Sequence, residues 1–104
     1  MATWTLTRQQ DNEWHCYELH MAGVLVATAK WRSHGQHAEI HNLVHHCTLA
    51  SLRACRDVFT TEIRPDIRAS GCTMLMALSD GYDEKMSRYW RLMGFTTFLA
   101  AMEV

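Results

Sequence analysis

The chain has 104 residues, 48% of them hydrophobic and 20% charged, and its formal net charge is −1. These values fit one globular domain over residues 1–104 and exclude a disordered tail, while the small net charge excludes a general attraction to polyanions. We therefore expect neither nucleic acid nor a membrane as a partner, and the lack of a signal-peptide pattern predicts a cytoplasmic protein.

The first half of the sequence predicts an antiparallel meander of four strands. Apolar and polar residues alternate in the first and fourth segments, as they do in half-buried strands, and the second and third segments are rich in β-forming residues. Turn-forming residues separate the segments, and Gly23 after Ala22 permits the positive φ of a tight hairpin. The fourth segment sets Ala38 and Ile40 on the face opposite Glu39. The predicted strands are Thr3–Gln9, Trp14–Met21, Val24–Trp31 and His37–His45.

In the second half, an apolar period of three to four predicts a helix with Thr48 as its N-cap. Pro65 is expected to end or kink this helix near Arg64, with one further turn through Ile67. A nearly all-apolar run then predicts a strand covered on both faces, followed by a second helix and a last strand. These segments are Cys72–Leu78, Asp83–Met93 and Phe95–Met102.

The predicted fold is an α/β (α+β) domain with a mixed sheet and two main helices. An antiparallel meander leads into a βαβ crossover, in the order β-β-β-β-α-β-α-β. Both helices are expected to pack on the sheet, because an apolar strand face needs a covering layer.

Three segments of the chain have a recognisable pattern: the hairpin Glu18–Ala27, the strand Ala38–Val44, and Arg88–Phe95, which ends in Gly-Phe. Over residues 14–98, this set resembles the GNAT superfamily of N-acyltransferases. The segments are similar to its second-to-third strand hairpin, its fourth strand and its C-terminal Tyr-x-x-x-Gly-Phe segment. The resemblance implies a GNAT-like fold, and compact proteins of this outline occur among bacterial and bacteriophage proteins.

In active members of that superfamily, a loop rich in glycine and arginine follows the fourth strand and holds the pyrophosphate of acetyl-CoA at a helix N-terminus. The corresponding residues 45–51 contain no glycine and no arginine. Glu39 lies where some members keep a general base, so it is the candidate catalytic residue. If acetyl-CoA binds, the resemblance implies that the cofactor-binding residues are Cys47, Thr48, Leu49, Ala50, Ser51 and Arg53.

Two further differences from the superfamily concern the last helix and the first connection. Trp90 stands where many members carry a tyrosine general acid, and an indole cannot deliver a proton near neutral pH. A short turn replaces the pair of helices that, in members, joins the first two strands and shapes the acceptor side of the cleft. The sequence therefore predicts a degenerate GNAT-like domain without a firm cofactor, acting as a binding or structural module for a protein partner or a second copy. The alternative is an acetyl-CoA-dependent N-acyltransferase with a divergent cofactor loop.

Other residue patterns suggest zinc, redox or protein binding. Every fourth residue of His37–His45 is a histidine, but such positions lie roughly 13 Å apart along a strand, too far for adjacent zinc ligands, so we predict no metal site. The four cysteines are scattered without a CxxC pair and are predicted to stay reduced. Trp4, Trp14 and Trp31 are expected to form a protein-binding patch if their exposed faces gather at the first strands.

Overall fold

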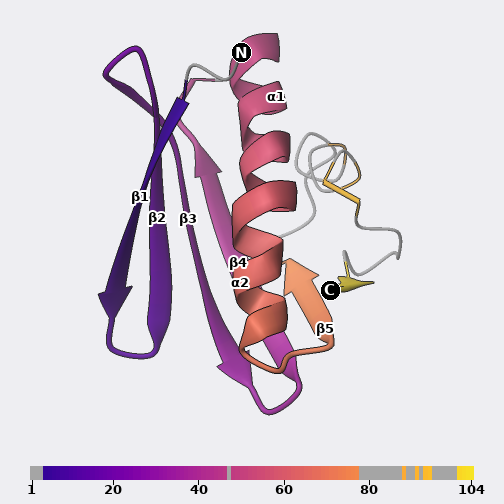
Figure 1. Ribbon diagram of the computed structural model, residues 1–104. Helices are drawn as coiled ribbons and strands as arrows, with labels where there is room; N and C mark the ends of the chain where they lie inside the picture. Colours follow the sequence, from indigo (N-terminus) through magenta and orange to yellow (C-terminus); the bar gives the residue numbers. More distant parts are fainter. Residues whose placement is uncertain (1–3, 47, 78–87, 89–90, 92, 95–100) are drawn as a thin grey trace.

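In the computed structural model, six strands form one mixed sheet, and a long helical segment packs on one of its faces (Figure 1). The structure describes residues 4–46, 48–77, 88, 91, 93–94 and 101–104. Each strand lies beside its neighbours in sequence, in the order β1-β2-β3-β4-β5-β6. The strands are β1 Trp4–Asp11, β2 Trp14–Met21, β3 Val24–His34, β4 His37–Val44, β5 Met74–Ala77 and β6 Ala101–Glu103. The predicted mixed α/β sheet is confirmed.

The first four strands form the predicted meander, with antiparallel pairing throughout. Ala22 and Gly23 both have positive φ, 51° and 78°, as the tightest two-residue hairpins require. β3 continues to His34, three residues beyond its predicted end, because the following turn needs only Gly35 and Gln36. Most of the predicted helix Asp83–Met93 lies outside the described residues, although Arg88 and Arg91 are helical. Most of the predicted last strand also lies outside them, and its end is present in β6.

The helical segment after β4 runs without interruption through α1 Leu49–Val58, η1 Phe59–Ile63 and α2 Arg64–Ala69. Of the two predicted outcomes at Pro65, an end of the helix is wrong, whereas the further turn through Ile67 is present as α2. Just before Pro65 the chain widens into a π-helical turn, in which the Arg64 N–H donates to the Phe59 carbonyl. The altered spacing accommodates a residue that has no N–H, so the helix continues past the proline. None of the described helices is long and apolar enough to cross a membrane.

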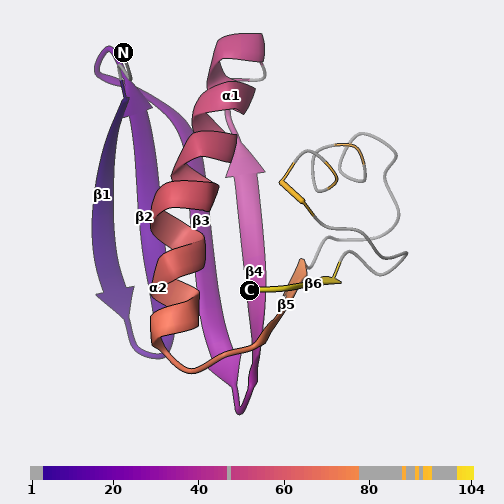
Figure 2. The same ribbon diagram turned by 45° about the vertical axis from the view of Figure 1, so that its right-hand side comes forward.

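This helical segment is the crossover between β4 and β5, which pair in parallel from His37–Met74 to Ile40–Ala77. Figure 2 shows the helix lying across β2 and β3. We call the sheet face that it packs against the covered face, and the opposite side the open face. The covered face carries Tyr17, Leu19, Trp31, Ile40 and Leu75, and the open face carries Trp14, Cys16, Lys30, Arg32, Glu39 and His41.

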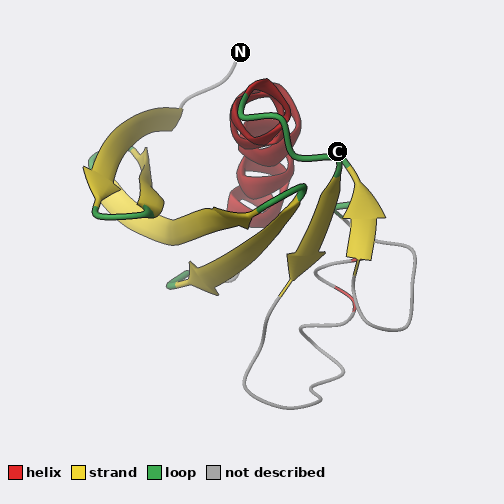
Figure 3. Cartoon of the chain, turned by 90° about the horizontal axis from the view of Figure 1, so that it is seen from below, coloured by secondary structure: helices red, strands yellow, loops and turns green. Residues whose placement is uncertain are grey.

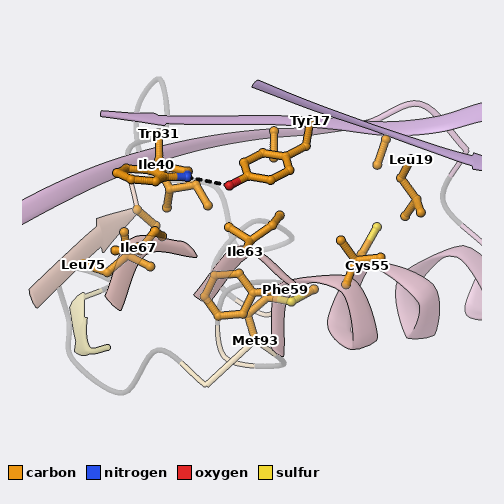
Figure 4. Packing of buried hydrophobic residues seen from close by; sticks show 14 of the residues in the cluster. Tyr17, Leu19, Trp31, Ile40, Cys55, Phe59, Ile63, Ile67, Leu75 and Met93 are labelled. Carbon is orange, nitrogen blue, oxygen red and sulfur yellow. Dashed lines mark hydrogen bonds between the residues drawn. The ribbon is translucent and has the colours of Figure 1, made fainter. Parts of the chain in front are cut away.

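The hydrophobic core fills the space between the covered face and the helix (Figure 4). Trp31 and Leu75 from the sheet and Ile67 from α2 are almost completely buried, and Met93 packs beside Phe59. The prediction that the fifth strand is covered on both faces is wrong, because Met76 is 41% exposed on the open face. The apolar strand β5 therefore has one face that is buried, with Leu75 and Ala77, and one face that is partly exposed to solvent.

A polar network crosses this core from sheet to helix. The Trp31 indole Nε1 donates to the Tyr17 hydroxyl at 2.8 Å, and that hydroxyl donates to Asp66 Oδ2 at 2.9 Å (Figure 4 draws the first bond). Burial raises the pKa of Tyr17, so its hydroxyl remains a neutral donor. Arg8 on β1 also donates to Asp66, at 3.1 Å. The network thereby ties β1, β2 and β3 to α2.

Candidate functional site

Glu39, the candidate base, lies on β4 on the face opposite Ala38 and Ile40, as predicted, and this face is the open one. Its side chain is only 11% exposed, because its neighbours enclose it. Arg32 Nε donates to Glu39 Oε1, and His34 Nε2 lies 2.9 Å from the same oxygen. Arg32 in turn donates to Glu13 Oε1 at 2.6 Å through Nη1. We call Glu13, Arg32, His34 and Glu39 the Glu39 cluster.

The electrostatics of the Glu39 cluster oppose proton uptake by the carboxylate. Burial acts to raise the pKa of Glu39, but the hydrogen bonds and positive charge of His34 and Arg32 outweigh it and leave the pKa below its usual range. A general base is most effective when its pKa lies near the working pH. Glu39 is therefore held as an ionised partner of Arg32, which suits a structural ion pair better than proton transfer.

Trp14 on β2 lies next to the Glu39 cluster, and two cationic side chains contact its ring. The Arg32 guanidinium carbon lies 4.5 Å and the Lys30 Nζ 4.6 Å from its ring centroid. His41 meets the same ring edge-on, with centroids 5.3 Å apart. Beside this group a shallow groove crosses β2, β3 and β4. It is lined by Cys16, Glu18, Thr28, Lys30, His41 and Leu43.

The histidines of the fourth strand do not converge on one point. His37 and His41 share the open face, whereas His45 follows the end of β4, where its backbone N–H donates to the Val26 carbonyl at 2.8 Å. Among the described side chains, no three of His, Cys, Asp or Glu come close enough together to hold a metal ion. Cys16, Cys55 and Cys72 carry reduced thiols.

The predicted tryptophan patch does not form. Trp31 is 1% exposed and belongs to the core, since its side chain points to the covered face. Trp4 also packs toward that face, whereas Trp14 lies on the open face at the other end of the β1–β2 hairpin. Strand alternation and register therefore separate the three indoles.

The predicted cofactor residues lie at the start of α1, apart from Cys47, which lies outside the described residues. Thr48 is the N-cap, as predicted: its hydroxyl accepts from the Ser51 N–H at 3.1 Å, and the Ser51 hydroxyl accepts from the Thr48 N–H at 3.0 Å. Ser51 is buried, and its hydroxyl also donates to the His46 carbonyl. Leu49, Ala50 and Arg53 are exposed.

This arrangement fits the pyrophosphate of coenzyme A poorly. The capping box already uses the Ser51 amide and the Thr48 hydroxyl, two of the groups that an anion at this helix start needs. No glycine lies in residues 45–51 to let a phosphate approach the backbone. The only cation among the predicted cofactor residues is Arg53.

The partners of Glu39 were missed when the sequence was considered alone. The sequence did contain a signal for the pairing of Arg32 with Glu39. A two-residue turn at Gly35 and Gln36 sets the register of the hairpin that flanks it. Counting outward from that turn pairs Arg32 with Glu39, an opposite-charge pair directly across two strands. His34 was missed because its side chain reaches Glu39 diagonally, and diagonal contacts depend on the twist of the sheet.

No family model matches the sequence, and comparison with curated proteins finds no match. Several solved structures are similar. The GNAT domain of S. lividans PAT matches with a TM-score of 0.65 and 16% identity, covering 88% of this chain and 61% of that one. Aminoglycoside acetyltransferase AAC(6')-Ib in complex with coenzyme A matches with a TM-score of 0.61 and 9% identity, covering 81% and 56%.

A third similar structure is the solution structure of the putative N-acetyltransferase YhhK from E. coli bound to coenzyme A. It matches with a TM-score of 0.59 and 16% identity, covering 91% of this chain and 73% of that one. The chain spans less than two thirds of the length of the first two structures. With the strand order and crossover described above, these likenesses show that the chain has a GNAT-like fold, as the sequence predicted.

Proposed function

We propose that this GNAT-like domain is a binding module that does not carry out ordinary acetyl transfer. The observation that carries the proposal is the state of Glu39, whose carboxylate is enclosed, bonded to Arg32 and His34, and has a lowered pKa. A residue held in this way is a poor acceptor for the proton of an attacking amine.

The start of α1 supports the same proposal. Thr48 and Ser51 satisfy each other there, and the loop before them lacks glycine. Where the fold is retained but the anion-binding groups are occupied, fold alone is a weak argument for activity. Leu43 and Met76, both exposed on the open face, instead provide apolar surface for contact with another macromolecule.

The second candidate is an acetyl-CoA-dependent N-acyltransferase with a divergent cofactor site. Two of the similar structures contain coenzyme A, and the exposed residues at the start of α1 include the cation Arg53. This candidate requires Glu39 or a neighbouring histidine to accept a proton. It also requires the Thr48–Ser51 capping box to open.

The experiment that separates the two is calorimetric titration of coenzyme A and of acetyl-CoA into the protein, beside an assay for free thiol released with a panel of amines. We expect no binding at millimolar ligand and no turnover. Micromolar binding that weakens in Arg53→Ala, with turnover that is lost in Glu39→Gln, would overturn the proposal. Arg68→Ala is the matched control, because Arg68 is exposed at the far end of the helical segment.

A further inference from the structure

We infer that β1 is a self-association edge, through which two copies of this chain pair antiparallel into one continuous sheet. β1 is the outermost strand in the sheet order and pairs, among the described strands, with β2 alone. The N–H and C=O groups that point away from β2 are therefore available to an extended segment of another chain. Figure 3 shows this strand, which follows the N-terminus, at the outer rim of the sheet.

β1 lacks most of the features that usually prevent edge pairing. Natural edge strands are short, bulged, or carry lysine or proline. β1 is eight residues long, contains neither of those residues and pairs with β2 in unbroken register. Its one cation, Arg8, is an inward-pointing charge of the kind that can protect an edge. Ion pairs with Glu62 at 2.6 Å and Asp66 at 3.1 Å partly neutralise that charge. The only register shift that involves the hairpin lies between β2 and β3.

Symmetry limits the register of such a pair. A two-fold axis perpendicular to the sheet keeps each face on its own side, so residues on the covered face oppose residues on the covered face of the second copy. Centring the pair on Thr7 sets Thr7 opposite Thr7 of the second copy and extends the ladder over Trp4–Gln10. Centring it on Arg8 sets the two arginines directly opposite each other, which is unfavourable.

The register centred on Thr7 also produces compatible side-chain pairs. On the open face, Thr5 opposes Gln9 and the two copies of Thr7 oppose each other, all of them exposed and uncharged. On the covered face, Leu6 opposes the aliphatic part of Arg8, which is long enough to cover it. Cross-strand pairs of this kind stabilise a sheet, and no like charges lie directly opposite each other in this register. The two copies of Arg8 are diagonal neighbours, and each has its own carboxylate partners, Glu62 and Asp66.

The inference rests on the proposed binding function, since it names a second copy of this chain as what the module binds. However, different results would disprove the self-association inference and the proposed function. Micromolar coenzyme A binding with turnover that is lost in Glu39→Gln would overturn the proposed function without changing the particle mass. A monomeric particle would overturn self-association without restoring acetyl transfer.

The first test is light scattering of the full chain over a range of concentrations. We expect a dimer for the wild type and, for Thr7→Lys, a dimer dissociation constant about tenfold or more higher, because two lysines then face each other across the two-fold axis. Thr60→Lys is the matched control on the exposed side of η1 and should leave the dimer unchanged. A wild type that stays monomeric throughout, or a dimer that is indifferent to Thr7→Lys, would overturn the inference.

The second test is disulfide trapping. Directly opposite residues of an antiparallel pair have Cα atoms ~4.5–5.5 Å apart, within the range of a disulfide. Thr7→Cys should therefore yield a covalent dimer under mild oxidation. Thr5→Cys should not, because the proposed register places the two copies of Thr5 roughly 13 Å apart. The wild type provides the background from the native cysteines, and equal trapping by both variants would rule out this register.

Discussion

The two faces of this sheet are stabilised by different forces. On the covered face, Trp31, Ile40 and Leu75 are almost completely buried against the helix, whereas the open face relies on ion pairs and on cations over Trp14. Apolar burial contributes about 25 cal/mol for each Å² removed from water, while exposed ion pairs contribute ~0–1 kcal/mol each. This difference indicates that most of the stability of the fold comes from apolar burial on the covered face. Residues of the open face can therefore change at a smaller cost in stability.

The largest expected effect comes from comparing two tryptophans on opposite faces. Trp31→Ala should lower the free energy of unfolding by about 3–5 kcal/mol, because it removes a buried ring and leaves a cavity. Trp14→Ala, the matched change on the open face, should cost about 1 kcal/mol. Urea unfolding followed by far-UV circular dichroism measures both. Equal losses would show that the open face contributes as much stability as the core.

The next effect concerns the polar network within the core. Tyr17→Phe removes the acceptor of the Trp31 indole N–H and should cost about 1–3 kcal/mol, since that donor stays buried without its partner. Thr61→Val is the control: it removes an exposed hydroxyl bond to the Asp57 carbonyl and should change stability by less than about 0.5 kcal/mol. If Tyr17→Phe leaves the free energy of unfolding unchanged in the same urea series, the network adds no stability.

On the open face, Glu39→Gln should cost about 1–2 kcal/mol at pH 7, because Arg32 and His34 lose a charged acceptor. The folded pKa of Glu39 is lowered, so its contribution is fully present above the unfolded value of about 4.3 and is lost as pH falls through the folded pKa. Unfolding in urea at pH 7, 5 and 3 should show that the difference in free energy of unfolding between the wild type and Glu39→Gln becomes smaller as the pH falls.

Glu13→Gln is the control for that experiment. Glu13 bonds to the same arginine but is 63% exposed, so its loss should cost less than about 0.5 kcal/mol. A gap for Glu39→Gln that stays constant from pH 7 to 3 would contradict the lowered pKa.

The smallest expected effect lies at the edge of the groove on the open face. Lys30→Met should cost about 0.5–1 kcal/mol through the lost contact with the Trp14 ring. Arg53→Met, an exposed cation on α1, should change stability by less than about 0.5 kcal/mol. Indistinguishable unfolding curves for the two variants would show that the contact of Lys30 with Trp14 adds nothing to the fold.

Much of the fold was predictable because its signals are local. A β-rich composition and the Ala22-Gly23 turn predicted β2 with both ends correct, and Thr48 was identified as the helix N-cap. Less of the candidate site was predictable. Glu39 was placed on the face opposite Ala38 and Ile40, but its low pKa depends on Arg32 and His34, which reach it only when β3 and β4 pair. The burial of Trp31 likewise depends on which face the helix covers.

By itself, the sequence determined the meander, the start of the helix and the resemblance to a GNAT-like fold, because turns, caps and strand periods act over a few residues. Only the tertiary structure decided how those elements are used. Pairing of β3 with β4 turned a candidate base into an ion-paired carboxylate, and a π-helical turn carried the helix past Pro65. The physical reason is that the pKa of a side chain, its burial and the tolerance of a helix for proline depend on how the whole chain packs. Local sequence patterns do not encode that packing.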